Sequence, residues 1–384
     1  MATQFEYEPT SRAFELNLNL TNLSDVEGEV DPANIVLTSQ YADGVIFSNF
    51  TADSTNLGLS GKGQTGIEWD SLIPKIKAEN PQTFAISGGG EIGASATLLT
   101  PPDTSIAGMA ELELVADISD DVRQVSGCVN VSNGSFEQGD LGILFTDIAL
   151  QSHVDQDVVQ IDQFLAQDGQ GGSLSGNGEL SLSDGGAGRL SLTSDNMRWV
   201  SRDDLSAELS GEILVQGSED QIRVDAEMNV DEAYIDLDRL PAPSRPTLPV
   251  RFVDELESNS SPPALIELDI GISSDGGIVA EGLGLDAELS VDMRLTGSME
   301  EPVFDGQADI VRGNYVFATQ RFDFVDSRVL LRPGSDPITL DIRAEREDAD
   351  VTVIVEISGT PERPVIAISS QPDLPEDEIL SRIL

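Results

Sequence analysis

Histidine and cysteine, the residue types that most often serve as catalytic base and thiol nucleophile, each occur once in this 384-residue chain. His153 is the only histidine, and no GxSxG motif accompanies it to supply a serine nucleophile. Cys128 is the only cysteine and lies in GCVNV, where we expect a strand in which it is a small packing residue. A histidine without a nucleophile gives no basis for hydrolase chemistry. We therefore predict no catalytic residue and no enzymatic activity.

The sequence also predicts no cofactor and no metal site. GKGQTG (61–66) fits GxGxxG, but it does not clearly join a strand to a helix, the context in which a helix N-terminus receives a pyrophosphate, so we expect a turn. Acidic residues cluster in EREDAD (345–350) and elsewhere, yet there is no EF-hand loop or GGxGxD repeat for calcium. A zinc-binding CxxC or Cys/His cluster is also missing.

The charge of the chain excludes one class of partner. The sequence has 69 acidic and 21 basic residues, a formal net charge of -48. Such a surface repels nucleic acid and naked anionic membrane, so we predict no nucleic-acid partner. A solvated surface adapted to salt or to high solubility accounts for the charge, and we infer no substrate from it.

Any functional residues must be positioned by strands, because apolar and polar residues alternate along most of the chain. Phe14, Leu16, Leu18 and Leu20, for example, share one face of a strand. Clusters of Gly, Asn, Asp and Ser interrupt these runs about every 8 to 12 residues, as in consecutive hairpins or meanders. Open twisted sheets rarely exceed about ten strands without curling. We predict an all-β fold, a long repetitive curled sheet of many short antiparallel or meandering strands around an apolar groove.

Two proline clusters, in PAPSRPTLP (241–249) and SNSSPP (258–263), cannot supply donors to a β-ladder. They mark either a linker or a long loop within one sheet. The expected organisation is a repetitive β segment over 1–120, a repetitive β groove over 121–240, a Pro/Ser-rich loop or linker over 241–263, and a β segment over 264–384 that ends in a short helix.

The closing stretch SSQPDLPEDEILSRIL (369–384) changes to a helical spacing of apolar residues. Asp373 and Glu376 fit a capping box, and Pro375 is tolerated in the first turn. So short a helix is not stable alone and must dock on the strands. We predict that it docks through Ile379, Leu380, Ile383 and Leu384.

The stretch GTPERPVIAISSQPDLPEDEILSRIL (359–384) resembles the C-terminal region of the TamB family. TamB is the inner-membrane-anchored subunit of the translocation and assembly module of Gram-negative bacteria. Residues 282–324 and VSGCVNVSNGSFEQGDLGILFTDIAL (125–150) also resemble the family. The resemblance is specific from about residue 120 onward and only generic, as repetitive β structure, before that.

The resemblance implies a β groove folded like a taco shell, whose apolar interior conducts phospholipid acyl chains between the inner and outer membranes. It implies a periplasmic location, a role in outer-membrane protein assembly and protein secretion, and a TamA-like outer-membrane barrel protein as partner. Family members have an N-terminal membrane anchor and continue past the helix. We therefore expect this chain to be a fragment without the anchor, the signal and part of the segment that docks on the partner.

The densest aromatic cluster, Tyr315, Phe317, Phe322 and Phe324, is compatible with both cross-strand packing and the lining of an apolar channel. The residues that we expect to line the lipid groove are Leu289, Val291, Met293, Leu295, Tyr315, Phe317, Phe322, Phe324, Ile338, Leu340, Ile342, Val351, Val353, Val355 and Ile357. Two other functions remain open. The first is an assembly or chaperone module that binds outer-membrane protein strands by edge pairing. The second is a secreted structural β-repeat protein.

Overall fold

The computed structural model describes most of the chain. The described residues are 2–8, 13–23, 32–70, 73–76, 82–93, 103–119, 122–218, 220–239, 265–299, 301–317, 319–334, 338–348, 350–361, 363–375 and 377–379. The predicted loop or linker at 241–263 lies outside them.

Strands contain 81% of the described residues, which confirms the predicted all-β fold. The described residues of helical type are the 3-10 turn η1 (Asp184–Gly186), Asp377–Ile379 of a short C-terminal helix, and Gly93. The strands are β1 (Ala2–Glu8), β2 (Ala13–Leu23), β3 (Ala33–Ala42), β4 (Val45–Asp53), β5 (Leu57–Asp70), β6 (Ile73–Ile76), β7 (Gln82–Glu91), β8 (Thr104–Ser119), β9 (Val122–Gln138), β10 (Ile143–Asp155), β11 (Val158–Gln167), β12 (Ser173–Ser181), β13 (Gly188–Ser201), β14 (Leu205–Gly217), β15 (Gln221–Asp236), β16 (Leu265–Gly282), β17 (Leu285–Ser298), β18 (Pro302–Phe317), β19 (Gln320–Phe324), β20 (Arg328–Leu331), β21 (Ile338–Glu347), β22 (Thr352–Thr360) and β23 (Arg363–Gln371).

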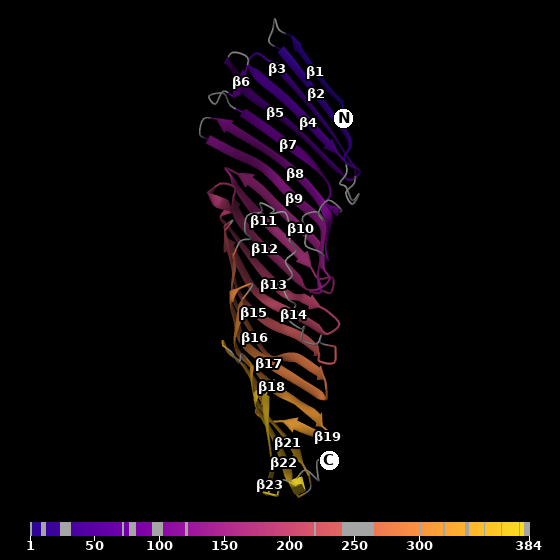
Figure 1. The fold of residues 1–384 in the computed structure, drawn as a ribbon, viewed down its shortest axis with the longest axis vertical. Helices are drawn as coiled ribbons and strands as arrows, with labels where there is room; N and C mark the ends of the chain where they lie inside the picture. The colour runs from indigo at the N-terminus through magenta and orange to yellow at the C-terminus, as the bar shows by residue number, and fades with distance from the viewer. Residues whose placement is uncertain are drawn as a thin grey trace, which may run out of the picture. The chain divides into compact units, whose positions relative to one another are not determined.

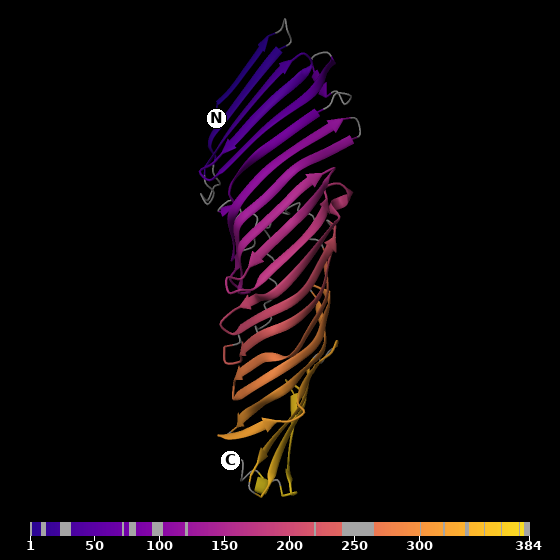
Figure 2. The same cartoon turned by 180° about the vertical axis from the view of Figure 1, so that it is seen from behind.

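The chain divides into two units, Met1–Leu192 and Thr193–Leu384, and the division falls within β13. In unit 1, strands that follow one another in sequence pair antiparallel from β1 to β5 and from β7 to β12. β7 continues the sheet on β5, and the short β6 pairs with the end of the same strand. Figures 1 and 2 show these strands as a ladder from both sides.

Unit 2 follows the same plan with two departures. β15 and β16 pair parallel, whereas the other described pairings of the unit are antiparallel. β18 pairs with β19 through its last residues and with β20 through residues 306–309, and both short strands then pair with β21. β22 and β23 complete the described part of the sheet.

The expected turn at GKGQTG (61–66) is wrong, because these residues lie in the middle of β5. Gly61 lies under the ring of Phe50, and Gly63 lies under the ring of Phe84. A Cβ at Gly61 would stand 2.0 Å from Phe50 Cε1, and one at Gly63 would stand 2.8 Å from Phe84 Cδ1. The glycines give cross-strand rings room to lie flat on the sheet, a role that needs no ligand.

The cluster SSDGG (273–277), one of the Gly, Asn, Asp and Ser clusters that were expected to interrupt the strands, instead lies inside β16. The register of β16 against β17 shifts between Ser274 and Ile278, which is the signature of a β-bulge. Gly277 has φ +81°, and its N–H donates to Glu288 Oε1 at 3.1 Å. This hydrogen bond, ahead of the one from Arg312, lowers the pKa of Glu288. The carboxylate thus holds the bulge in place.

Candidate functional site

Apolar side chains of unit 2 gather on one face of its sheet, because the register brings them opposite one another on neighbouring strands. On β17, the predicted Leu289, Val291, Met293 and Leu295 alternate with polar residues and so project to the same side. Their partners, in this order, are Ile310, Ala308, Gly306 and Phe304 on β18, and Ile278, Ser274, Ile272 and Ile270 on β16. We call this side the apolar face of unit 2.

The apolar face continues onto the strands that precede β16. Val230 and Ala233 of β15 and Ile278 of β16 form a buried cluster, each with no more than 8% exposure. The partly buried residues that pack against this cluster are Ala207, Leu209, Ile235, Ile272, Leu289 and Val291. The face therefore extends without interruption from β14 to β17.

The face also continues beyond β18. Tyr315 lies opposite Phe322, Phe324 lies opposite Ala344, and Ala344 lies opposite Val355. Along the same strands, Leu340 lies opposite Val329, and Ile342 lies opposite Ile357. The remaining predicted groove residues are Phe317, at the end of β18, Ile338, at the start of β21, Val351, directly before β22, and Val353, within β22. Strand alternation puts Phe317, Ile338 and Val353 on this face, whereas their contact with lipid stays a prediction.

The opposite, polar face of the same strands is charged and crossed by ion pairs. Arg294 of β17 contacts Asp269 of β16 at 2.5 Å and Glu227 of β15 at 3.3 Å, and Arg223 contacts Asp269 at 3.4 Å. The hydrogen bond from Arg294 lowers the pKa of Asp269 below its ordinary 3.8, against partial burial, and the charges of both arginines act in the same direction. This network joins three strands, including the parallel pair, on the side away from the apolar residues.

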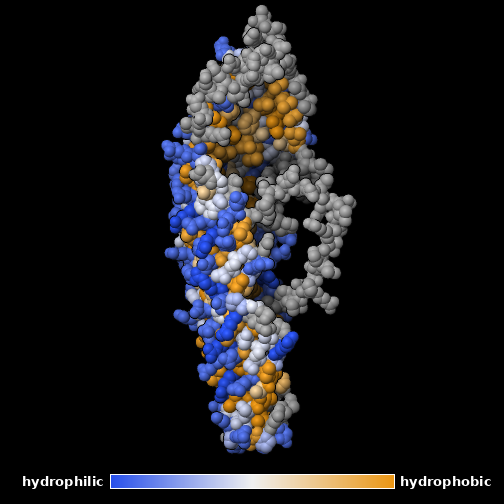
Figure 3. Space-filling view, turned by 60° about the vertical axis from the view of Figure 1, so that its left-hand side comes forward, coloured by the Kyte–Doolittle hydropathy of each residue, from blue (hydrophilic) through white to orange (hydrophobic). Residues whose placement is uncertain are grey.

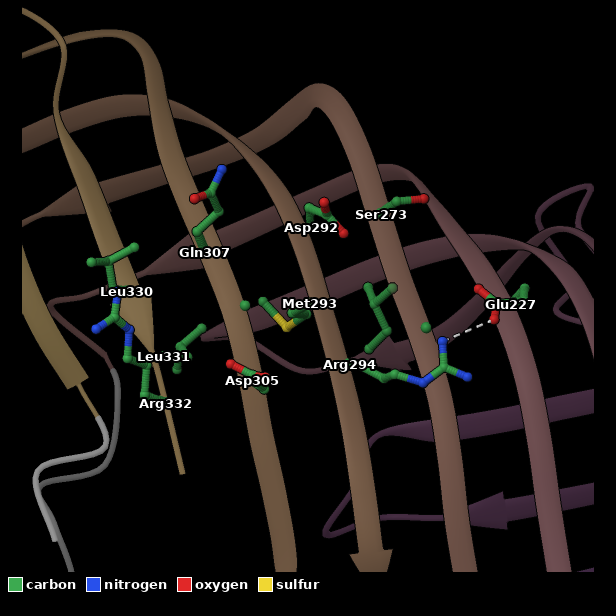
Figure 4. A pocket seen from close by; sticks show the side chains of 13 residues that line it. Glu227, Ser273, Asp292, Met293, Arg294, Asp305, Gln307, Leu330, Leu331 and Arg332 are labelled. Carbon is green, nitrogen blue, oxygen red and sulfur yellow. Dashed lines mark hydrogen bonds and ion pairs between the residues drawn. The ribbon is translucent and has the colours of Figure 1, made fainter. Parts of the chain in front are cut away.

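An open depression of about 530 Å³ lies over residues of β15 to β18 and β20 (Figure 4). In the figure Arg294 points toward Glu227, while Asp292 and Asp305 stand nearby. Carboxylates and guanidinium groups are mixed around it, so no single ligand charge is favoured. Within the described residues no group of three or more side chains is arranged to hold a metal ion. The lining of the depression therefore indicates no ligand class, whereas the apolar face favours apolar ligands.

The C-terminal helix packs on the apolar face of unit 2. Ile379 is 2% exposed and forms a buried cluster with Phe322, Ala344 and Val353. The carbonyl of Pro375 accepts hydrogen bonds from the N–H groups of Glu378 at 3.0 Å and Ile379 at 3.1 Å, which are bonds of the first helical turn. The other predicted docking residues, Leu380, Ile383 and Leu384, lie outside the described residues.

Unit 1 has an apolar face built in the same way. Phe14, Leu16, Leu18 and Leu20 of β2 lie opposite Tyr41, Ser39, Leu37 and Ile35 of β3, and the rings of Phe14 and Tyr41 stack at 5.7 Å. On β7, Phe84 and Ile86 lie opposite Ala116 and Leu114 of β8. Figure 3 shows hydrophobic residues of this unit gathered in a hollow beside a hydrophilic outer surface.

Sequence reasoning did not select Phe84 and Ile86, although their exposures of 38% and 36% make them the kind of residue that an apolar ligand contacts. The signal is the alternation in QTFAISGGGE (82–91), which three consecutive glycines obscure. Cys128 and His153 lie opposite each other on the polar face, and His153 Nδ1 is 2.8 Å from Asp162 Oδ2. The side chains of His153 and Asp162 are about half exposed, so solvent screens this pair.

A model of the TamB C-terminal domain matches residues 162–384. The match covers more than half of the chain, with all of unit 2 and the last strands of unit 1. The chain belongs to the TamB family. The family resemblance seen in the sequence is thereby confirmed, and the matched part begins later than the residue near 120 from which we judged it specific. A comparison with curated proteins gave no match.

Membership in the TamB family supports a TamB-like role in the translocation and assembly module. TamB proteins are periplasmic bridge proteins of a non-enzymatic module that is associated with a TamA-type partner. In the part of the chain that the structure describes, no helix is long and apolar enough to cross a membrane.

Proposed function

We propose that the apolar face of this TamB protein binds phospholipid acyl chains and conducts them between the inner and outer membranes. The observation that carries the proposal is the continuity of the face, because in unit 2 apolar residues stand opposite one another from β14 to β22. An acyl chain on this face removes apolar side chains from water. The backbone groups of the strands meanwhile keep their hydrogen bonds within the sheet.

Several large side chains on these faces are exposed. Phe84 and Tyr315 are 38% and 36% exposed, and Phe304 is 44% exposed. Contiguous exposed apolar surface in a highly charged protein marks an interaction site. Each methylene group that leaves water contributes about 0.8 kcal/mol, so an acyl chain that lies across several strands is bound by many small gains. No base or nucleophile takes part.

Lipid analysis with a matched pair of variants tests this proposal. Leu340 and Thr339 are neighbours on β21 that project to opposite faces of the sheet. Native mass spectrometry with lipid extraction should find phospholipid on the wild-type chain and on Thr339→Asp, but not on Leu340→Asp, since a buried charge excludes acyl chains. Equal lipid on both variants, or a lipid-free wild type after incubation with phospholipid vesicles, would contradict the proposal.

We further infer a periplasmic location, inner-membrane anchoring of the full-length protein, and a TamA-like outer-membrane barrel protein as partner, with support of outer-membrane protein assembly and protein secretion. Family membership supports these inferences. The acidic surface supports the absence of a nucleic-acid partner.

One observation favours a second candidate function, the binding of outer-membrane protein strands by edge pairing. Among the described residues β23 pairs with β22 along one edge, and Val365 and Ile366 of β23 are 62% and 61% exposed. Unpaired apolar edges are templates for an added strand. A photoreactive residue at Val365 should then crosslink a peptide copied from an outer-membrane barrel strand, and the lack of such an adduct would count against this function.

A further inference from the structure

Two aromatic residues that face each other in one hairpin differ sharply in exposure. Tyr315 of β18 and Phe322 of β19 are cross-strand partners, yet Tyr315 is 36% exposed and Phe322 is 3% exposed. Directly opposite residues project to the same face of a sheet, so the strands themselves do not produce this difference. The cover is Ile379 of the C-terminal helix, which packs in one buried cluster with Phe322.

The helix segment covers one end of the apolar face on β19 and β21 to β23. Leu374 packs against the same cluster that contains Ile379. We call the residues beneath them the covered patch, which consists of Phe322, Phe324, Ala344, Val353, Val355 and Ile368. Further along β21 to β23, the same face carries what we call the open patch, which consists of Leu340, Ile342, Ile357 and Ile366. Ile366 in the open patch is 61% exposed, whereas Val353 in the covered patch is 1% exposed.

The covering segment is fixed at both of its ends. Near the end of β23, Ser370 is buried, and its Oγ donates to the carbonyl of Pro372 at 2.8 Å and accepts from the N–H of Leu374 at 3.0 Å. These two bonds fold the chain back onto the sheet at Leu374. Ile379 then secures the segment from the other side of Pro375. The covering segment is therefore held on the sheet by hydrogen bonds and by buried side chains.

The segment narrows the apolar face. On β17 the face runs from Leu285 to Leu295, about 33 Å at 3.3 Å per residue. On β22 Val353 and Val355 are covered, and the uncovered part begins only at Ile357. Leu374 and Ile379 are aliphatic side chains that pack on this face, so the face binds aliphatic groups.

We propose that Leu374 and Ile379 are permanent internal occupants of the apolar face, and that acyl chains pass beside them over the open patch. This inference rests on the proposed lipid function and specifies its route. Ile357 and Leu340 contact lipid, whereas Phe322, Phe324, Val353 and Val355, which the sequence predicted as groove residues, seat the helix instead.

Photocrosslinking in the 384-residue chain tests the route. Met293, Tyr315, Phe322 and Ile357 are each replaced by p-benzoylphenylalanine, and the purified proteins are incubated with vesicles of phosphatidylethanolamine whose acyl chains are tritiated. Tyr315 and Phe322 are a matched pair, because both are aromatic and they face each other. We expect acyl adducts at Met293, Tyr315 and Ile357, and no adduct at Phe322.

The alternative results separate the route from the function. An adduct at Phe322 equal to that at Tyr315 would show that the helix leaves the face and would overturn the inference. Adducts at Met293 and Tyr315 without one at Ile357 would overturn the route over the open patch while the lipid function stands. No adduct at any position would overturn both. If the Phe322 variant fails to fold by circular dichroism, Phe324 in the covered patch serves in its place.

Discussion

At the scale of single residues, the fold requires glycine at some positions as strictly as it requires a large side chain at others. Gly61 and Gly63 of β5 lie under the rings of Phe50 and Phe84, and the resulting spacing imitates a dinucleotide-binding motif. A glycine motif indicates only that some other group approaches the backbone closely at these positions. Whether a phosphate or a ring approaches it depends on the neighbouring strands, which the motif does not contain.

We predict that Gly61→Val destabilises unit 1, because its Cβ would stand 2.0 Å from Phe50 Cε1 and would push the ring off the sheet. Overpacking of this kind costs about 1–3 kcal/mol, which urea unfolding followed by circular dichroism measures. Gly58→Val is the control, because a Cβ there would meet only Asp53 Oδ1, at 3.4 Å. Equal unfolding midpoints for the two variants would show that Phe50 does not need the space.

The pKa of Asp269 leads to a prediction about acid. Its value is lowered in the folded chain by the hydrogen bond from Arg294, so the unfolded chain takes up a proton first as pH falls below the ordinary 3.8. The stabilisation is therefore complete at neutral pH and is lost as pH falls through the folded pKa. Asp269→Asn should unfold at lower urea than wild type at neutral pH, with a gap that closes in acid.

Asp292→Asn provides the control for this experiment, because Asp292 is an exposed carboxylate on the neighbouring strand β17. At neutral pH its unfolding midpoint should stay close to that of the wild type, because substitutions at exposed positions change stability little. A gap for Asp269→Asn that persists unchanged well below the ordinary pKa would mean that the residue stabilises the sheet by something other than its charge.

At the scale of elements, the C-terminal helix depends on a single described anchor. Ile379→Ala should lower the free energy of unfolding of unit 2 by about 2–5 kcal/mol, because it leaves a cavity between Phe322 and Val353. Asp377→Ala in the same helix is exposed and should change it little. Urea unfolding of both variants measures the difference. Similar stability of the two would mean that the helix adds nothing to the sheet.

The sequence predicts the strands well and their connections less well. Alternation identifies the shared face of Leu289 and Val291 because it depends on local geometry alone. It does not reveal that β15 and β16 pair parallel, since alternation is the same in both kinds of pairing. Nor does it reveal that SSDGG (273–277) is a bulge, because Glu288 on the next strand holds it. Coverage of Phe322 by Ile379 is equally non-local, and the alternating pattern treats Phe322 and Tyr315 alike.

At the scale of the molecule, the large negative charge and the apolar faces belong together. A chain with 69 acidic residues keeps its polar side hydrated and self-repelling, which protects a protein with exposed apolar surface from aggregation. The charge itself identifies no substrate. What identifies the family is the matched sequence of residues 162–384, and what supports the lipid proposal is the register of the strands.

The parallel pair has a further consequence for how the sheet is made. In a ladder of hairpins each strand is added to the one synthesised just before it, with short loops to close. After β15 this rule is suspended, because Gln221 pairs with Leu265 and residues 237 to 264 must be made before the next strand can begin. Pairing two strands across so large a separation in sequence is slow compared with forming a hairpin. If the chain folds from its N-terminus, the edge of β15 that receives β16 therefore stays unpaired until residues 265–282 arrive, whereas β15 itself joins β14 at once as a hairpin.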